Sequence, residues 1–143
     1  MADPIDLSSS IAAVVDGSLG RGRAVAIAYV DEDGAPAISY RGSTQVYSND
    51  QLAIWARKQD SGIAAAIAKN PQVALVFLDP EGDPAYLNIR GRAHVDPSAN
   101  DKVYSSMIQG ERDQDPDRNG VAIVIDVDSV AGGGSGGYFQ QAR

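Results

Sequence analysis

Cysteine is absent from this chain of 143 residues, and histidine occurs only once, as His94. Without cysteine the protein can form no disulfide, thiolate nucleophile, iron–sulfur cluster or thiolate zinc site. A single imidazole cannot build a multi-histidine metal centre, although it could serve as one axial ligand of haem. We therefore expect no metal centre held by protein side chains.

Basic residues are few as well: 12 Lys and Arg stand against 19 Asp and Glu, which gives a net charge of −7. A surface of this sign repels a phosphate backbone, so we expect no nucleic-acid partner. No segment approaches the roughly 18 consecutive apolar residues that cross a bilayer. Asp3 and Asp6 precede the first apolar run, unlike the basic start of a signal peptide. We expect no membrane partner and a cytoplasmic location.

Motifs of dedicated hydrolases and nucleotide-binding proteins are missing too. The sequence has no Walker loop, nucleophile elbow or dinucleotide-binding glycine fingerprint. General acid–base catalysis needs a carboxyl group in an apolar site, whereas the carboxylates near the end of the chain are typical of a solvated surface: Asp113, Asp115, Asp117, Asp126 and Asp128. We assign no catalytic residue.

What the sequence does contain is a regular pattern of short strands. Hydrophobic residues make up 43% of the chain, enough for a packed core. Period-two or continuous apolar patterns between turn residues predict strands over residues 24–30, 35–40, 45–47, 52–56, 73–78, 85–95 and 121–125. The pieces between residues 24 and 56 follow one another so closely that we expect three neighbouring antiparallel strands.

Helical signals interrupt this pattern in three places. Apolar spacing predicts a leading helix within residues 5–16, an alanine-rich helix from Asp60 or Ser61 to Lys69, and a third helix over residues 97–108. Residues 110–120 read as a polar loop. The fold class is therefore mainly β with helical insertions, a small antiparallel barrel.

We place this single domain in residues 1–130. Residues 131–143 form a Gly-rich C-terminal segment that we expect to lie outside the barrel, as a docked tail or an appended expression sequence.

The best candidate site is the junction between the strand that ends at Ala56 and the alanine-rich helix. Arg57 and Lys58 follow the strand directly, and Ser61 and Gly62 begin the helix. Unpaired N–H groups and the positive end of the helix dipole, together with the two cations, would hold a phosphate or carboxylate. Asp60 opposes such binding. The alternative interpretation is that Arg57 and Lys58 are solvated charges.

Two further features allow both functional and structural interpretations. Trp55, the only tryptophan, could stack on a planar ring, fill a dimer contact or pack in the core. Arg90, Arg92 and His94 recur at period two on the polar face of one strand, where they could meet acidic groups of a ligand or face solvent.

The order of these parts resembles the pyridoxamine 5'-phosphate oxidase-like family of FMN-binding split β-barrels. The resemblance covers about residues 5–130, and it is carried by the hairpin 24–36, the strand Leu52–Arg57, the helix and strand of Ser61–Leu75 with Asn70-Pro71 between them, and Ile89-Arg90-Gly91-Arg92-Ala93. It implies a split barrel, a homodimer and FMN or a deazaflavin coenzyme at the subunit interface. The cofactor-binding residues would be Trp55, Ala56, Arg57, Lys58, Ser61 and Gly62.

The sequence departs from the family at the phosphate clamp. Family members carry Ser followed by Arg and Lys before the Asn-Pro helix, whereas here Ser61 is followed by Gly62 and Ile63. The first hypothesis is an FMN- or deazaflavin-dependent oxidoreductase acting on a small planar substrate. The second is a haem- or tetrapyrrole-binding protein of the same fold, with His94 as axial ligand and Arg90 and Arg92 near the propionates. The third is a catalytically silent dimeric barrel.

Overall fold

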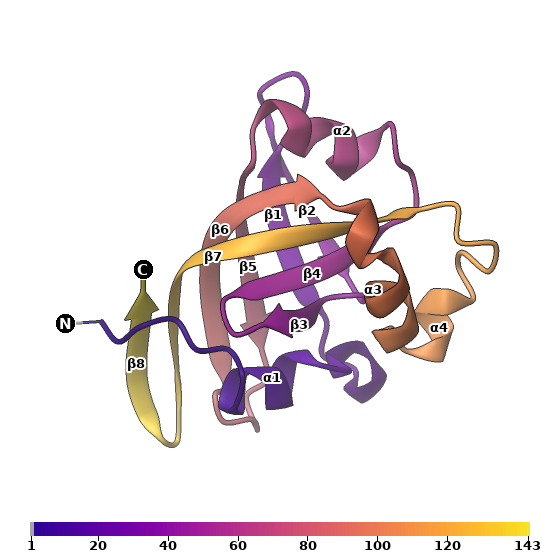
Figure 1. Cartoon of the computed structure of the whole chain (residues 1–143). Helices are drawn as coiled ribbons and strands as arrows, with labels where there is room; N and C mark the ends of the chain where they lie inside the picture. Colours follow the sequence, from indigo (N-terminus) through magenta and orange to yellow (C-terminus); the bar gives the residue numbers. More distant parts are fainter. Residues whose placement is uncertain (1) are drawn as a thin grey trace.

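The computed structural model describes residues 2–143, which form one antiparallel sheet with short helices around it (Figure 1). The strands are β1 Val25–Val30, β2 Pro36–Arg41, β3 Gln45–Ser48, β4 Gln51–Ala56, β5 Gln72–Leu78, β6 Tyr86–Val95, β7 Val121–Gly134 and β8 Gly137–Ala142. The helices are α1 Ser10–Val15, η1 Ser18–Arg21, α2 Gly62–Lys69, η2 Pro97–Ala99, α3 Asn100–Ser106 and α4 Gln109–Arg112. None of them, within residues 2–143, is long and apolar enough to span a membrane.

The sheet of eight strands runs in the order β2-β1-β5-β6-β7-β4-β3, and β8 pairs with β7. The 14-residue strand β7 organises this sheet, because its first half pairs with β4 and its second half with β8, while β6 pairs along both halves. Figure 1 shows the sheet curving around its core, with α1 across one end and α2 across the other. The predicted mainly antiparallel split barrel with helical insertions is confirmed.

The barrel interior holds the main core, which includes Leu75, Ile89 and Ile123 together with Ile63 and Ile67 from α2. Each of these side chains is buried, and burial of one such side chain stabilises the fold by about 1.5–3 kcal/mol. Strand β6 follows the predicted alternation, with Leu87, Ile89 and Ala93 inside and the polar residues outside. Val95, expected inside, is exposed.

A second, smaller core lies on the other side of β4 and β7, where α3 packs. It includes Trp55, Val103, Tyr104 and Met107. Both faces of β4 and of the first half of β7 are therefore covered, which explains why Val121–Ile125 is apolar at every position instead of alternating.

Several expectations from the sequence need correction. Strands β2 and β3 do not pair; they lie on the two edges of the sheet, since β2 pairs with β1 and β3 pairs with β4. The predicted third helix is divided into η2 and α3, and the polar loop contains α4. The leading helix is confined to α1.

The Gly-rich C-terminal segment is part of the sheet. Residues 131–134 extend β7, and β8 returns along it. Asp3 hydrogen-bonds to the outer edge of β8 through Gln140 and Ala142, so the two ends of the chain lie together (Figure 1). This segment looked like a tail because its glycines carry no side-chain pattern. They are needed where strands approach closely: a Cβ on Gly132 would lie 2.8 Å from the Phe139 ring and from the Tyr86 carbonyl oxygen.

One face of the sheet is apolar yet uncovered. We call it the outer apolar face and define it by Ile38 and Tyr40 of β2, Val76 and Leu78 of β5 and Tyr86 of β6. The register brings these residues together, because Ala26 of β1 lies between Tyr40 and Val76, and Leu78 is opposite Tyr86. Ile38 is 71% exposed and Tyr40 77%.

Candidate functional site

The junction of β4 and α2 opens onto a cavity of about 520 Å³. The cavity is lined by Arg41, Ala56, Arg57, Lys58, Ser61, Gly62, Ile63, Gln114, Asp115 and Asn119. Five of the six residues named from the sequence as cofactor-binding therefore line one cavity: Ala56, Arg57, Lys58, Ser61 and Gly62. We call it the β4–α2 pocket.

The start of α2 leaves its donors free to face this pocket. Ser61 occupies the N-cap position, but its side chain makes no capping hydrogen bond. Gly62 has φ +59°, a conformation that a side chain would strain, and a Cβ added there would meet nothing within 4 Å. The exposed helix start, with its partial positive charge, favours an anion at this position.

Arg41, at the end of the edge strand β2, is the residue that sequence reasoning missed. Its Nε is buried and has no hydrogen-bond partner; among residues 2–143 the only other buried side-chain atom in this condition is Oγ of Ser39, two residues earlier on the same face. Burial lowers the pKa of Arg41; the Tyr29 hydroxyl opposes this effect, and the positive charge of Arg57 adds to it. Two guanidinium groups thus lie near one another without a salt bridge to either among the described residues.

Arg57 and Lys58 are exposed at the mouth of the pocket. The Nη1 of Arg57 lies 3.4 Å from Oε1 of Gln114, a long contact that leaves most of its donors free. Gln59, next in the chain, donates to the carbonyl oxygens of Asn119 and Gly120 at 2.9 and 3.2 Å. The strand end is therefore tied to the loop on the opposite side of the pocket, while the two cations remain available.

That opposite wall is built on Asp115, a buried carboxylate that the sequence analysis placed on the solvated surface. Asp115 is only 6% exposed. It accepts hydrogen bonds from Nε1 of Trp55 at 2.9 Å and from the backbone N–H groups of Asn119 and Gly120 at 2.9 and 2.8 Å. Burial opposes its ionisation, but these hydrogen bonds and the charge of Arg57 outweigh burial and lower the pKa of Asp115.

Trp55 does not line the pocket, and its assignment as a cofactor-binding residue needs correction. Its side chain is 4% exposed and packs edge-on against Tyr104, with 5.3 Å between ring centroids. The ring lies on the α3 side of β4, where it packs in the second core with Val103 and Met107. Trp55 is thus a buried residue of the second core and lies outside the lining of the pocket.

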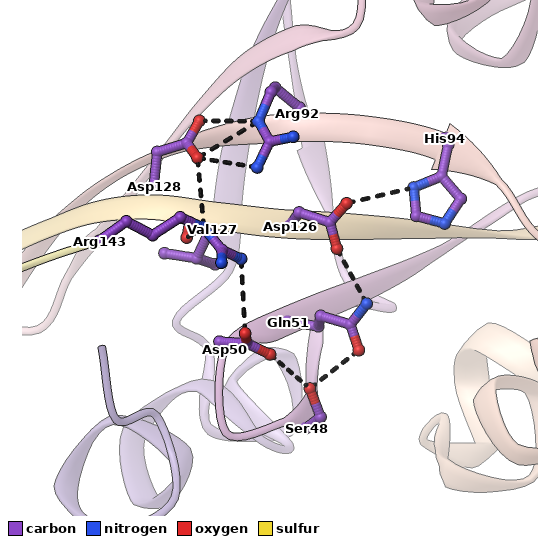
Figure 2. A network of polar contacts seen from close by, with 9 residues as sticks. All are labelled: Ser48, Asp50, Gln51, Arg92, His94, Asp126, Val127, Asp128 and Arg143. Atoms are coloured by element: carbon purple, nitrogen blue, oxygen red, sulfur yellow. Dashed lines mark hydrogen bonds and ion pairs between the residues drawn. The ribbon is translucent and has the colours of Figure 1, made fainter. Parts of the chain in front are cut away.

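The three residues of the haem hypothesis lie at exposed positions of β6. Figure 2 shows two of them, Arg92 and His94, with their carboxylate neighbours. Arg92 holds Asp128 through Nε and Nη2 at 3.0 to 3.2 Å, which raises the pKa of Arg92. Nδ1 of His94 lies 3.7 Å from Asp126. Asp126 in turn accepts from Gln51 at 2.9 Å. The charge of Arg92 is thus engaged within the protein, and Arg90 stands apart from this network.

The sequence of residues 13–132 matches the model of a family described as pyridoxamine 5'-phosphate oxidase. The match covers most of the chain, including the β4–α2 pocket and the exposed face of β6. Among curated proteins, no sequence match to the chain was found.

Three solved structures illustrate the likeness in fold. An FMN-binding protein of Nostoc punctiforme PCC 73102, related to pyridoxamine 5'-phosphate oxidase, has 18% identity and a TM-score of 0.63 over 85% of this chain and 78% of its own. An F420 reductase has 20% identity and a TM-score of 0.58 over 76% and 88%. A Clostridium acetobutylicum protein related to general stress protein 26 has 12% identity and a TM-score of 0.61 over 87% and 89%. At these identities the likeness establishes the fold alone.

Proposed function

The chain belongs to the pyridoxamine 5'-phosphate oxidase family, and from this membership we propose that it is an oxidoreductase that binds FMN, or a deazaflavin coenzyme, and acts on a small planar substrate. The cofactor's phosphate would lie in the β4–α2 pocket. The observation that carries the proposal is Arg41, whose buried Nε has no partner and whose charge lies near that of Arg57. Neither guanidinium forms a salt bridge among the described residues, although the charges of Glu111 and Asp115 act on Arg41 and Arg57, and a phosphate would accept several of their free hydrogen bonds at once.

Each lining residue has a role in this arrangement. Arg41 and Arg57 would bind phosphate oxygens from the two strands, and Lys58 would add charge at the mouth. The Ser61 hydroxyl and the first N–H groups of α2 would complete the anion site, with Gly62 allowing close approach. These groups would replace the Arg and Lys that family members carry where this chain has Gly62 and Ile63. The bound flavin would supply the hydride chemistry, and the protein would bind, orient and shield it.

We further propose that the outer apolar face binds a second copy of the chain. Soluble monomers rarely expose a contiguous apolar patch of this kind without a partner. The edge strand β2 belongs to both surfaces, since Tyr40 points to the outer apolar face and the next residue, Arg41, points to the pocket. A dimer formed through this face would therefore bring the partner next to the cofactor, as the family resemblance implies.

The test is a comparison of FMN with riboflavin, which has the same ring system but no phosphate. We expect FMN to bind more tightly, and Arg41→Gln and Arg57→Gln each to lower its affinity about tenfold or more, since a charge-assisted hydrogen bond contributes about 1.5–3 kcal/mol. Riboflavin affinity should change little. Lys69→Gln is the matched control, because Lys69 is exposed at the other end of α2. The deazaflavin coenzyme is titrated in parallel to decide between the two cofactors.

Equal affinity for FMN and riboflavin, or binding that is indifferent to both arginine variants, would contradict the phosphate assignment. Absence of binding by either cofactor would refute the cofactor proposal. Native mass spectrometry of the protein as purified reports the dimer, and Ile38→Asp is expected to convert it to a monomer. If flavin binds, NADH or NADPH is added anaerobically to ask whether the visible absorbance of the oxidised cofactor is lost.

A further inference from the structure

A second hollow, separate from the β4–α2 pocket, lies where β1, β5, β6 and β7 run side by side. It is on the same face of the sheet as the outer apolar face, since its lining residue Ala28 is opposite Ile38. Its volume is about 420 Å³, within the size range of small-molecule sites. Small apolar side chains line it on one side: Ala28, Val30, Pro36 and Ala74. Polar side chains at its other side are Gln72, Arg90 and Ser129. No residue lines both this hollow and the β4–α2 pocket.

Arg90 is the free cation of this region. The neighbouring arginines are engaged with carboxylates: Arg92 holds Asp128 as described above, and Arg143 lies 3.4 Å from Asp50 and 3.5 Å from Asp128 (Figure 2). Arg90 makes neither a salt bridge nor a side-chain hydrogen bond within residues 2–143. Asp128 also lines the hollow, but its charge is shared by Arg92 and Arg143, so it does not neutralise Arg90.

The backbone fixes the position of Arg90. The register between β6 and β7 shifts between Arg90 and Gly91, which marks a β-bulge. Gly91 permits the close approach of the strands there, because an added Cβ would collide with the Asp126 carbonyl oxygen and would lie 3.0 Å from Cγ2 of Ile125. Bulges alter the direction of side chains and are frequent beside binding sites. The backbone of Arg90 is therefore fixed beside the apolar part of the hollow, and its exposed side chain is free to meet a ligand there.

From this geometry we propose that the hollow binds a small planar carboxylic acid, with its carboxylate on Arg90 and its apolar ring over Ala28 and Ala74. A single free guanidinium matches a monoanion, and Ser129 and Gln72 add neutral donors on the same side. The small side chains give a flat surface that suits a ring better than a branched chain. This proposal does not depend on the cofactor proposed for the β4–α2 pocket.

The experiment uses 2-naphthoate as the probe and the full chain as purified. Binding is followed by NMR on isotope-labelled protein, and we expect the largest amide shifts at Ala74, Gly91 and Ser129. Arg90→Gln should weaken binding at least tenfold. The control is Arg118→Gln, a partly exposed arginine that pairs with Asp101 and lines neither the hollow nor the β4–α2 pocket, and it should leave the affinity within about twofold. The neutral analogue 2-naphthamide should bind wild type as weakly as 2-naphthoate binds the Arg90 variant.

Three results would overturn the proposal. The first is an affinity that Arg90→Gln does not lower, or that both arginine variants lower equally. The second is a set of shifts centred on Arg57 and Ser61, which would assign the probe to the β4–α2 pocket. The third is no binding in protein that native mass spectrometry shows to be a dimer, which would mean that the partner copy covers the hollow. Failure of the protein to bind FMN, by contrast, would not contradict the proposal that the hollow binds a carboxylic acid.

Discussion

The indole N–H of Trp55 donates a 2.9 Å hydrogen bond to the carboxylate of Asp115, 60 residues later in the chain. This contact connects β4 to the loop that forms the far wall of the β4–α2 pocket. The same carboxylate holds the loop's own backbone at Asn119 and Gly120. The shape of the pocket therefore depends on a buried charge that does not itself need to touch a ligand.

Replacing Asp115 by Ala is expected to destabilise the protein by about 3 kcal/mol, because three buried or partly buried N–H donors lose an ionised acceptor. The measurement is urea denaturation followed by Trp55 fluorescence, which reports the site directly. Asp117→Asn, an exposed carboxylate in the same loop, is the control and should shift the midpoint little. Equal stability of the two variants would mean that water replaces the carboxylate at no cost.

The contribution of Asp115 should also depend on pH in a defined direction. Its pKa in the folded protein is lowered below the ordinary value of 3.8, so the unfolded chain takes up a proton at higher pH than the folded one. Its stabilisation is then complete above about pH 4 and is lost as the pH falls through the folded pKa. The difference in unfolding free energy between wild type and Asp115→Asn should therefore shrink from pH 7 toward pH 3. A difference that stays constant would show that the hydrogen bonds do not require the ionised form.

Local patterns in the sequence predicted most of the elements. Alternation located β1, β2 and β6, and alanine content with Asn70-Pro71 located α2, because these signals arise from a few adjacent residues. The edge positions of β2 and β3 depend on pairing between distant segments, and no local pattern records them. The role of Asp115 was hidden for the same reason, since its partner Trp55 is distant in sequence.

Arg41 was missed for a smaller reason. Its strand was predicted to end at Tyr40, whereas the alternation continues for one more residue and places Arg41 on the same face as Ser39. A charged residue at a position where the alternation faces the protein interior is unusual, and the sequence alone showed this feature of Arg41. The sequence could not predict that Arg41 lies near Arg57, because β2 and β4 are not neighbours in the sheet.

Removing the charge of Arg41 should hardly change the stability of the ligand-free protein, but it should abolish the stabilisation of the protein by phosphate. In Arg41→Met the apolar stem is kept, while the unpartnered Nε and the repulsion from Arg57 disappear, so we expect a melting temperature equal to or above that of wild type. Inorganic phosphate at constant ionic strength should raise the melting temperature of wild type but not of the variant. Lys69→Met serves as the control. A variant that still responds to phosphate would remove Arg41 from the anion site.

The family's phosphate clamp can be restored at position 62 but not at position 63, because the surroundings of Gly62 and Ile63 differ. Gly62 faces open space, so Gly62→Arg should add a phosphate ligand and raise FMN affinity, at a cost of about 1–3 kcal/mol in stability for a side chain at φ +59°. Ile63 is only 3% exposed and belongs to the main core, so Ile63→Lys should destabilise the protein without improving binding. Chemical denaturation and FMN titration of the two variants test both statements. Tighter FMN binding by the Ile63 variant would show that this side chain can turn toward the pocket, and that α2 starts in a different orientation when the cofactor is bound.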